Sequence, residues 1–178
     1  MSKLVLNGDT SGSVTLDAPA VSGTTTLTLP TQSGTIITTG STFGGTGPAF
    51  FATPSTNQTL SNNTNTKILF QNEQFDTNSN FASSTFTPTV AGYYLISAQI
   101  ACISANSSEI SLRIFKNGSE YTRVGRLAPT GQTVYFGNSA LVSMNGSTDY
   151  LEMYVYTATG FTLESPYSLF SGFLARSA

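Results

Sequence analysis

Short runs in which apolar residues alternate with Thr or Ser recur along the chain and constrain its fold more than any other feature. Alternation with a period of two is typical of strands that bury one face. No stretch repeats apolar residues at the i, i+3, i+4, i+7 spacing of an amphipathic helix. The 16 Gly and 7 Pro among 178 residues supply turns between such strands. The sequence therefore predicts an all-β fold with essentially no helix.

A stretch rich in Gly, Ser and Thr at residues 41–48 separates two parts of the chain. We expect residues 1–40 to form a short β anchor or stalk, residues 41–48 a linker, and residues 49–178 a head. In the head, apolar runs follow one another at the spacing of a β-sandwich. The anchor has too few residues to cover its own apolar positions, so we expect it to pair with other chains or with a docking partner. The candidate anchor residues are Val14, Leu16, Leu27, Leu29, Ile36 and Ile37.

Two strand signals in the head are specific. Asn117-Gly118 lies between two alternating runs and predicts a tight hairpin, because both turn positions need positive φ. Residues 150–156 place Leu151, Met153 and Val155 on one face of a strand and three tyrosines on the other. Because both faces are rich in apolar surface, we expect a neighbouring subunit to cover the tyrosines. Solvated tyrosines on an outer sheet face are the alternative.

The charge pattern excludes several classes of function. Charged residues make up 9% of the chain, the formal net charge is -2, and no basic block is present, so nucleic acid is not an expected partner. No His is available as a general base or metal ligand. Only Glu73 and Asp76 are near neighbours within an expected loop, which leaves a paired-carboxylate hydrolase as a disfavoured alternative. Cys102 lies in an apolar run and is interpreted as a small buried hydrophobe. No cofactor is expected.

One series of residues in the head runs from an aromatic residue to an acid, through two further aromatic residues, into a Gly-x-Tyr strand: Phe70, Asp76, Phe81, Phe86, Gly92 and Tyr94. Through this series the head resembles the C1q-like domain family. Further segments that match in the family's order, over nearly the whole head, are 49–52, 112–118, 139–142, 145–147 and 170–174. The interval from Phe81 to Phe86 is two residues shorter than usual, and Ile96 and Ala98 stand where the family generally has aromatic residues.

The resemblance implies a ten-strand jelly roll similar to tumour necrosis factor, assembled as a homotrimer without enzyme activity. It also implies that the strand at 170–174 lies in the sheet near the threefold axis. Some family members bind calcium, for which Glu73, Asp76 or Asp149 could supply oxygen ligands. The family resemblance and the tyrosines at residues 150–156 together give the candidate residues for the trimer interface or core. These are Tyr94, Tyr150, Met153, Tyr154, Tyr156, Phe170 and Phe173.

The first forty residues resemble segments found near the ends of phage fibre and virion structural proteins. The sequence motifs that carry this resemblance are Gly12–Pro19 and Thr26–Pro30. The chain begins without the apolar core of a signal peptide, shows no collagen repeats, and has no apolar run of about 18 residues. We therefore expect a protein of a bacteriophage virion, without membrane insertion, that contacts other virion proteins.

Three functions stay open on this basis. The first is a structural knob on the capsid or tail, as a capsid decoration, head fibre or tail fibre. The second is an adhesin that binds a host surface glycan, and the third is a polysaccharide-hydrolysing spike. Candidate sugar contacts are the cations Arg113, Arg123 and Arg126 and the residues Asn106, Tyr135 and Tyr167.

Overall fold

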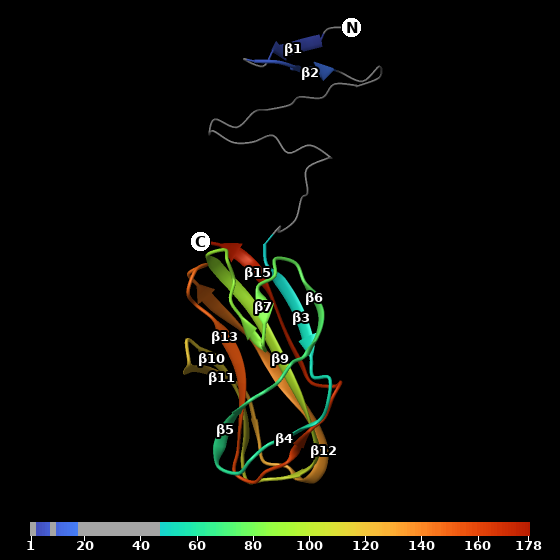
Figure 1. Cartoon of the computed structure of the whole chain (residues 1–178), viewed down its shortest axis with the longest axis vertical. Helices are drawn as coiled ribbons and strands as arrows, with labels where there is room; N and C mark the ends of the chain where they lie inside the picture. Colours follow the sequence, from blue (N-terminus) through green and yellow to red (C-terminus); the bar gives the residue numbers. More distant parts are fainter. Residues whose placement is uncertain (1–2, 8–9, 18–46) are drawn as a thin grey trace, which may run out of the picture. The chain divides into compact units, whose positions relative to one another are not determined.

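The computed structural model describes residues 3–7, 10–17 and 47–178. The chain divides into two compact units, Met1–Ser41 and Thr42–Ala178. The described residues form fifteen strands and no helix, which confirms the all-β prediction (Figure 1). None of these residues therefore belongs to a helix that could cross a membrane.

The described part of the N-terminal unit is a two-stranded antiparallel hairpin. Strand β1 (Lys3–Asn7) pairs with β2 (Ser13–Asp17), with Leu4 opposite Leu16 and Leu6 opposite Val14. Val14 and Leu16 thus lie in β2, as expected for an anchor built from strands. The remaining candidate anchor residues, which fall outside the described residues, are Leu27, Leu29, Ile36 and Ile37.

The head contains thirteen strands, three more than the ten expected, and four of them are only two residues long. Its strands are β3 (Ala49–Thr53), β4 (Gln58–Thr59), β5 (Thr64–Lys67), β6 (Asn72–Asp76), β7 (Phe81–Ala82), β8 (Thr85–Phe86), β9 (Gly92–Asn106), β10 (Ile110–Lys116), β11 (Ser119–Leu127), β12 (Thr130–Met144), β13 (Leu151–Thr157), β14 (Thr162–Leu163) and β15 (Leu169–Ser177).

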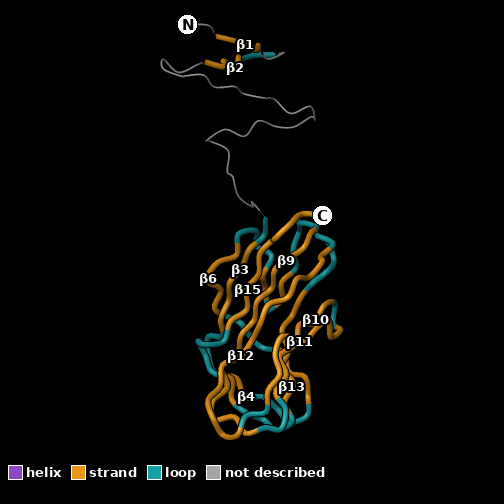
Figure 2. Tube along the Cα trace, turned by 180° about the vertical axis from the view of Figure 1, so that it is seen from behind, coloured by secondary structure: helices purple, strands orange, loops and turns teal. Residues whose placement is uncertain are grey.

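These strands form two sheets that pack as a jelly-roll sandwich, confirming the predicted architecture (Figure 2). One sheet has the order β11-β10-β13-β8-β7, with β5 also paired to β13, and is called the β13 sheet below. The other has the order β4-β14-β9-β15-β3-β6, with β12 also paired to β9, and is called the β9 sheet. All pairings between strands are antiparallel.

Aromatic rings from both sheets fill the core. Phe50 of β3 stacks on Phe81 and Phe86, with ring centroids 4.8 and 4.3 Å apart, and Phe170 of β15 meets Phe50 edge to face at 4.8 Å. Tyr94 of β9 contacts Phe86 at 5.5 Å. Such pairs add to the free energy gained by burying the rings themselves. The aromatic signature in the sequence therefore corresponds to one cluster that joins the two sheets.

The other signature residues shape the chain around this cluster. The carboxylate of Asp76 accepts hydrogen bonds from the backbone N–H groups of Phe81 (2.7 Å) and Asn78 (3.3 Å), which fixes the turn that leads to Phe81. Gly92 begins β9 where a Cβ would clash with the backbone of Arg176. Glycine is therefore required there by close approach of two strands.

Cys102 is fully buried within the sandwich, which confirms its interpretation as a small hydrophobe. Burial raises the pKa of its thiol to about 12, because the charged thiolate is poorly solvated there. The thiol is therefore protonated and unreactive at neutral pH.

The Asn117-Gly118 hairpin is confirmed. It connects β10 to β11, and its two residues have φ values of 54° and 77°. The Asn117 side chain also ties the turn to the start of β13: its oxygen accepts the N–H of Tyr150 at 2.9 Å, and its amide donates to Asp149 at 2.8 Å. The turn thus holds strand ends that are far apart in the sequence.

Replacing Asn117→Ala removes both hydrogen bonds and places alanine at positive φ. We expect the free energy of unfolding to fall by about 2 kcal/mol, measured by urea unfolding. Asn106→Ala is the matched control, because Asn106 is exposed at the end of β9 and has no side-chain hydrogen bond among the described residues. Equal stability of the two variants would contradict this account of the turn.

Candidate self-association surface

The outer face of the β9 sheet is almost free of charge. Strands β3, β9 and β12 carry no charged residue, and β15 carries only Arg176. Acidic side chains occur at the edge strand β6, as Glu73 and Asp76. A sheet face of this kind depends on hydroxyl and amide groups for solvation.

Apolar residues form a row across this face. The strand registers place Leu141 of β12 opposite Leu95 of β9, Leu95 opposite Phe173 of β15, and Phe173 opposite Ala49 of β3. Directly paired residues share one face of a sheet. Leu141 is 61% exposed and Phe173 is 48% exposed, so the row lies largely uncovered.

A second row combines hydroxyls with aromatic rings. Ser139, Ser97 and Ser171 lie opposite one another on β12, β9 and β15, and the Oγ atoms of Ser97 and Ser139 are 2.6 Å apart. The same row continues into Phe51 of β3 and Phe75 of β6, whose stacked rings are 6.3 Å apart. Tyr93 and Phe75, each about half exposed, extend the uncovered aromatic surface toward the ends of the sheet.

The β13 sheet has the opposite character, because every ion pair among the described residues lies on it or beside it. Glu120 pairs with Arg113 and with Arg123 at 2.8 Å, and Lys116 pairs with Asp149 at 2.8 Å. Lys67 donates to Glu152 at 2.7 Å. Charges that reverse sign over short distances keep this sheet well solvated.

The tyrosines of β13 lie on this charged sheet and are half-buried. The rings of Tyr154 and Phe115 are 4.2 Å apart, and the Arg113 guanidinium lies 4.8 Å from the centre of the Tyr156 ring. Groups of the same chain therefore cover part of the rings of Tyr154 and Tyr156, which the expectation of a covering subunit did not include. The assignment of Tyr150, Tyr154 and Tyr156 to a subunit interface stays a prediction.

The other candidates divide between core and surface. Tyr94, Met153 and Phe170 are fully buried in the sandwich, whereas Phe173 lies on the outer face of the β9 sheet. Burial and a hydrogen bond from the Tyr94 hydroxyl to the Val90 carbonyl give that tyrosine a purely internal role, and desolvation raises its pKa to about 12. Phe173 is thus the single member of the candidate set on the uncovered face.

Sequence analysis did not single out Leu95, Leu141, Phe51, Phe75 or Tyr93. The usable signal was the complete lack of charge along residues 92–106 and 130–144, two strands that pair over nearly their whole length. Alternation alone could not show which of their two faces remains uncovered, because that depends on pairing with distant segments.

The candidate cations, and Asp149 among the candidate acids, take part in the ion pairs. Arg113 and Arg123 lie opposite each other across the hairpin, but Glu120 accepts from both. Arg126 pairs with Glu109 at 3.1 Å. The positive charge of these arginines is therefore offset.

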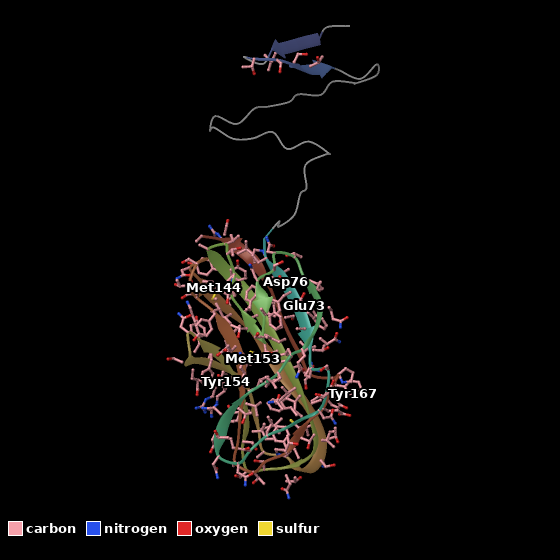
Figure 3. The ribbon with its side chains drawn as sticks, in the orientation of Figure 1. Glu73, Asp76, Met144, Met153, Tyr154 and Tyr167 are labelled. Carbon is pink, nitrogen blue, oxygen red and sulfur yellow. The ribbon has the colours of Figure 1, made fainter. Side chains whose placement is uncertain are left out.

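Among the described residues no three His, Cys, Asp or Glu side chains lie close enough together to hold a metal ion. Figure 3 shows Glu73 and Asp76 near each other on the β6 side of the head.

Known proteins with related sequence or structure agree with this architecture. Residues 49–175 match the family model of the C1q domain. The globular domain of zebrafish complement 1qA protein has a TM-score of 0.54 and 14% sequence identity, covering 74% of this chain and 99% of its own. Murine APRIL has a TM-score of 0.56 at 12% identity, covering 71% and 97%.

The Eiger TNF from S. frugiperda has a TM-score of 0.55 at 14% identity, covering 74% of this chain and 92% of its own. At these identities the structural matches establish the fold alone. Among curated proteins, none matches this chain in sequence.

Two carboxylates, one on the β13 sheet and one in the loop before β13, make stability depend on pH. Hydrogen bonds from Asn117 and Lys116 lower the pKa of Asp149, and a hydrogen bond from Arg123 lowers the pKa of Glu120. Because both values are lower in the folded chain than in the unfolded chain, these groups stabilise the fold at neutral pH. That stabilisation is lost as the pH falls through the ordinary carboxyl pKa toward the lower pKa of the folded chain.

We expect the melting temperature of the unmodified chain to fall between about pH 5 and about pH 3. The double variant Asp149→Ala/Glu120→Ala should be less stable at pH 7 and should lose less over this interval. Glu164→Ala, at a carboxylate outside the described ion pairs, is the control. Parallel melting curves for the double variant and the unmodified chain would contradict the assignment.

Proposed function

Because the chain belongs to the C1q domain family, we propose that its head closes into a homotrimer in which the outer face of the β9 sheet contacts the partner copies. The uncharged row of Leu141, Leu95 and Phe173, largely exposed in one copy, is the observation that carries this proposal. It agrees with the family's trimeric assembly and with the expectation that the strand at 170–174 lies near the axis.

Threefold closure requires two different patches on each copy, since only a twofold interface is self-complementary. The β9 sheet offers such a pair. Leu141 lies toward the β12 edge, whereas the stacked Phe51 and Phe75 lie at the β6 edge. Completing the burial of a half-exposed Leu or Phe contributes roughly 1 kcal/mol. Many such contacts, repeated in three interfaces, are needed to offset the cost of association.

We further propose that the trimer is a non-enzymatic knob of a bacteriophage particle, on the capsid or the tail, held there by the N-terminal segment. The phage-like sequence motifs in the first forty residues support this role. So does the β1–β2 hairpin, because two isolated strands are marginally stable and gain from a further partner. The absence of His from the sequence supports a role without catalysis.

An adhesin for a host surface glycan is the second candidate. This function assumes the same trimer. Three identical heads on one axis would turn weak binding into strong avidity. The observation in its favour is a pair of exposed tyrosines, Tyr135 and Tyr167, that meet edge to face on the head.

Replacing Leu141→Glu tests the trimer. Burying an unpaired carboxylate in each interface costs about 3 kcal/mol or more, so light scattering after gel filtration should show monomers where the unmodified chain is trimeric. Tyr121→Glu is the control, because Tyr121 is 48% exposed on β11 of the opposite sheet. A Leu141→Glu variant that remains trimeric would count against the β9 sheet as the interface.

Removing residues 1–17 tests the anchor. We expect the shortened chain to keep its trimeric head but to be missing from purified particles of the phage that encodes it, as judged by immunogold labelling. Particles that incorporate the shortened and the complete chains equally would contradict the role of the hairpin.

A further inference from the structure

Two aromatic side chains lie uncovered at the end of the β9 sheet away from Met144. Tyr135 of β12 lies opposite Ala101 of β9, and Tyr167 lies in the loop before β15. Their ring centroids are 6.0 Å apart with the rings at 88°, and the two residues are 55% and 54% exposed. Figure 3 shows Tyr167 projecting from the head, far along it from Met144. Because Tyr135 and Leu141 are six residues apart on β12, this tyrosine pair lies about 20 Å from the apolar row.

The segment that carries Tyr167 is held in place by hydrogen bonds to β9. The Gln99 side chain donates to the Tyr167 carbonyl oxygen at 3.1 Å. The buried hydroxyl of Ser168 accepts the N–H of Ala101 at 3.0 Å and donates to the Glu164 carbonyl at 3.0 Å. The tyrosine pair is therefore positioned before any partner covers it, which lowers the cost of ordering a contact.

The edge of the sheet opposite β12 also carries two uncovered apolar side chains. Phe75 of β6 is 50% exposed, and Leu69, in the segment before β6, is 45% exposed. The N–H of Leu69 donates to the side-chain oxygen of Gln58 of β4 at 3.0 Å, which ties this segment to the β9 sheet. Its neighbours Ile68 and Phe70 are buried, so Leu69 alone of the three is available for contact.

The strand registers place these two edges at matching heights along the strands. The register row that contains Phe75 runs through Phe51, Ser171 and Ser97 to Ser139 of β12, two residues from Leu141. The row that contains Gln58, which holds Leu69, runs through Leu163 and Cys102 to Val134, next to Tyr135. Leu69 is thus nearly level with Tyr135, and Phe75 with Leu141. A threefold rotation about an axis along the strands leaves each residue at its own height, so the edge of one copy can meet the face of the next at both points.

The surface between the two contact points is polar on both sides. On the face, Gln99 and Ser139 lie between the tyrosine pair and the apolar row. On the edge, Gln71 and Asn72 are exposed between Leu69 and Phe75. The side-chain oxygen of Gln71 already accepts a backbone N–H at 3.1 Å, which leaves its NH₂ group to donate. Both surfaces therefore follow the same order of apolar, polar and apolar groups.

We propose that the tyrosine pair of one copy packs on Leu69 of the next copy, while Leu141 packs against Phe75, so that two contacts about 20 Å apart fix the height at which copies associate. The inference rests on the trimer proposed above and adds its second contact. The apolar row alone would let copies slide along the strands in steps of two residues, because such a shift keeps the same face in the interface. The tyrosine pair is also the observation behind the adhesin candidate, and a covered ring cannot stack on a sugar, so the two roles exclude each other.

Paired cysteines in the complete chain test this arrangement. The matched double variants are Tyr135→Cys/Leu69→Cys and Leu141→Cys/Phe75→Cys, and the mismatched controls are Tyr135→Cys/Phe75→Cys and Leu141→Cys/Leu69→Cys. After treatment with a short bismaleimide, each matched variant should give roughly tenfold more covalent trimer on a denaturing gel than either mismatched variant. The native Cys102 is buried and does not compete for the reagent.

A second measurement follows the tyrosine pair by itself. The single variant Tyr135→Cys should react with a monofunctional maleimide roughly tenfold more slowly than Tyr121→Cys, because a partner copy covers the first position and leaves the second open. Tyr121 is the matched control, since it is 48% exposed in one copy and lies on the opposite sheet.

The outcomes separate this inference from the trimer itself. The inference is overturned if the unmodified chain is trimeric by light scattering but matched and mismatched variants crosslink equally. It is also overturned if Tyr135→Cys reacts as fast as Tyr121→Cys in that trimer, which would leave the tyrosines free for the adhesin role. A chain that is monomeric by light scattering would refute the trimer, and the second contact with it.

Discussion

Strand β9 is the constraint on which the rest of the head depends. Its 15 residues are hydrogen-bonded to β12, β15 and β14, so it lies at the centre of its sheet. Alternate residues, including Tyr94, Ile96 and Ile100, are fully buried against the β13 sheet. The residues between them form an outer face without charge. One alternating strand thus defines both the core of a copy and the surface through which, we propose, copies associate.

Charge is segregated between the two sheets, so the two outer faces of the head differ in polarity. Ion pairs such as Lys67–Glu152 and Arg113–Glu120 keep the β13 sheet compatible with water, while the β9 sheet carries Leu141 and Phe173 uncovered. Individual surface ion pairs contribute little to stability. Their effect would be on orientation, because a charged sheet disfavours burial and leaves the neutral sheet as the face that, we propose, associates.

Much of the fold was predictable from the sequence. The all-β class, the hairpin at Asn117 and the aromatic core followed from alternation, from turn chemistry and from the spacing of residues such as Phe86 and Tyr94. The surface was harder to predict. The tyrosines of β13 looked uncovered because sequence alternation does not reveal that Phe115 and Arg113, on the neighbouring strand, pack on them. The apolar row across four strands exists only once their registers are known.

Sedimentation equilibrium of the unmodified chain, over a dilution series through micromolar concentration, tests the central claim most directly. A neutral sheet face that is covered only by other copies predicts a particle with three times the 18.7 kDa mass of one chain. A folded species that keeps the mass of a single chain throughout the series would contradict the account.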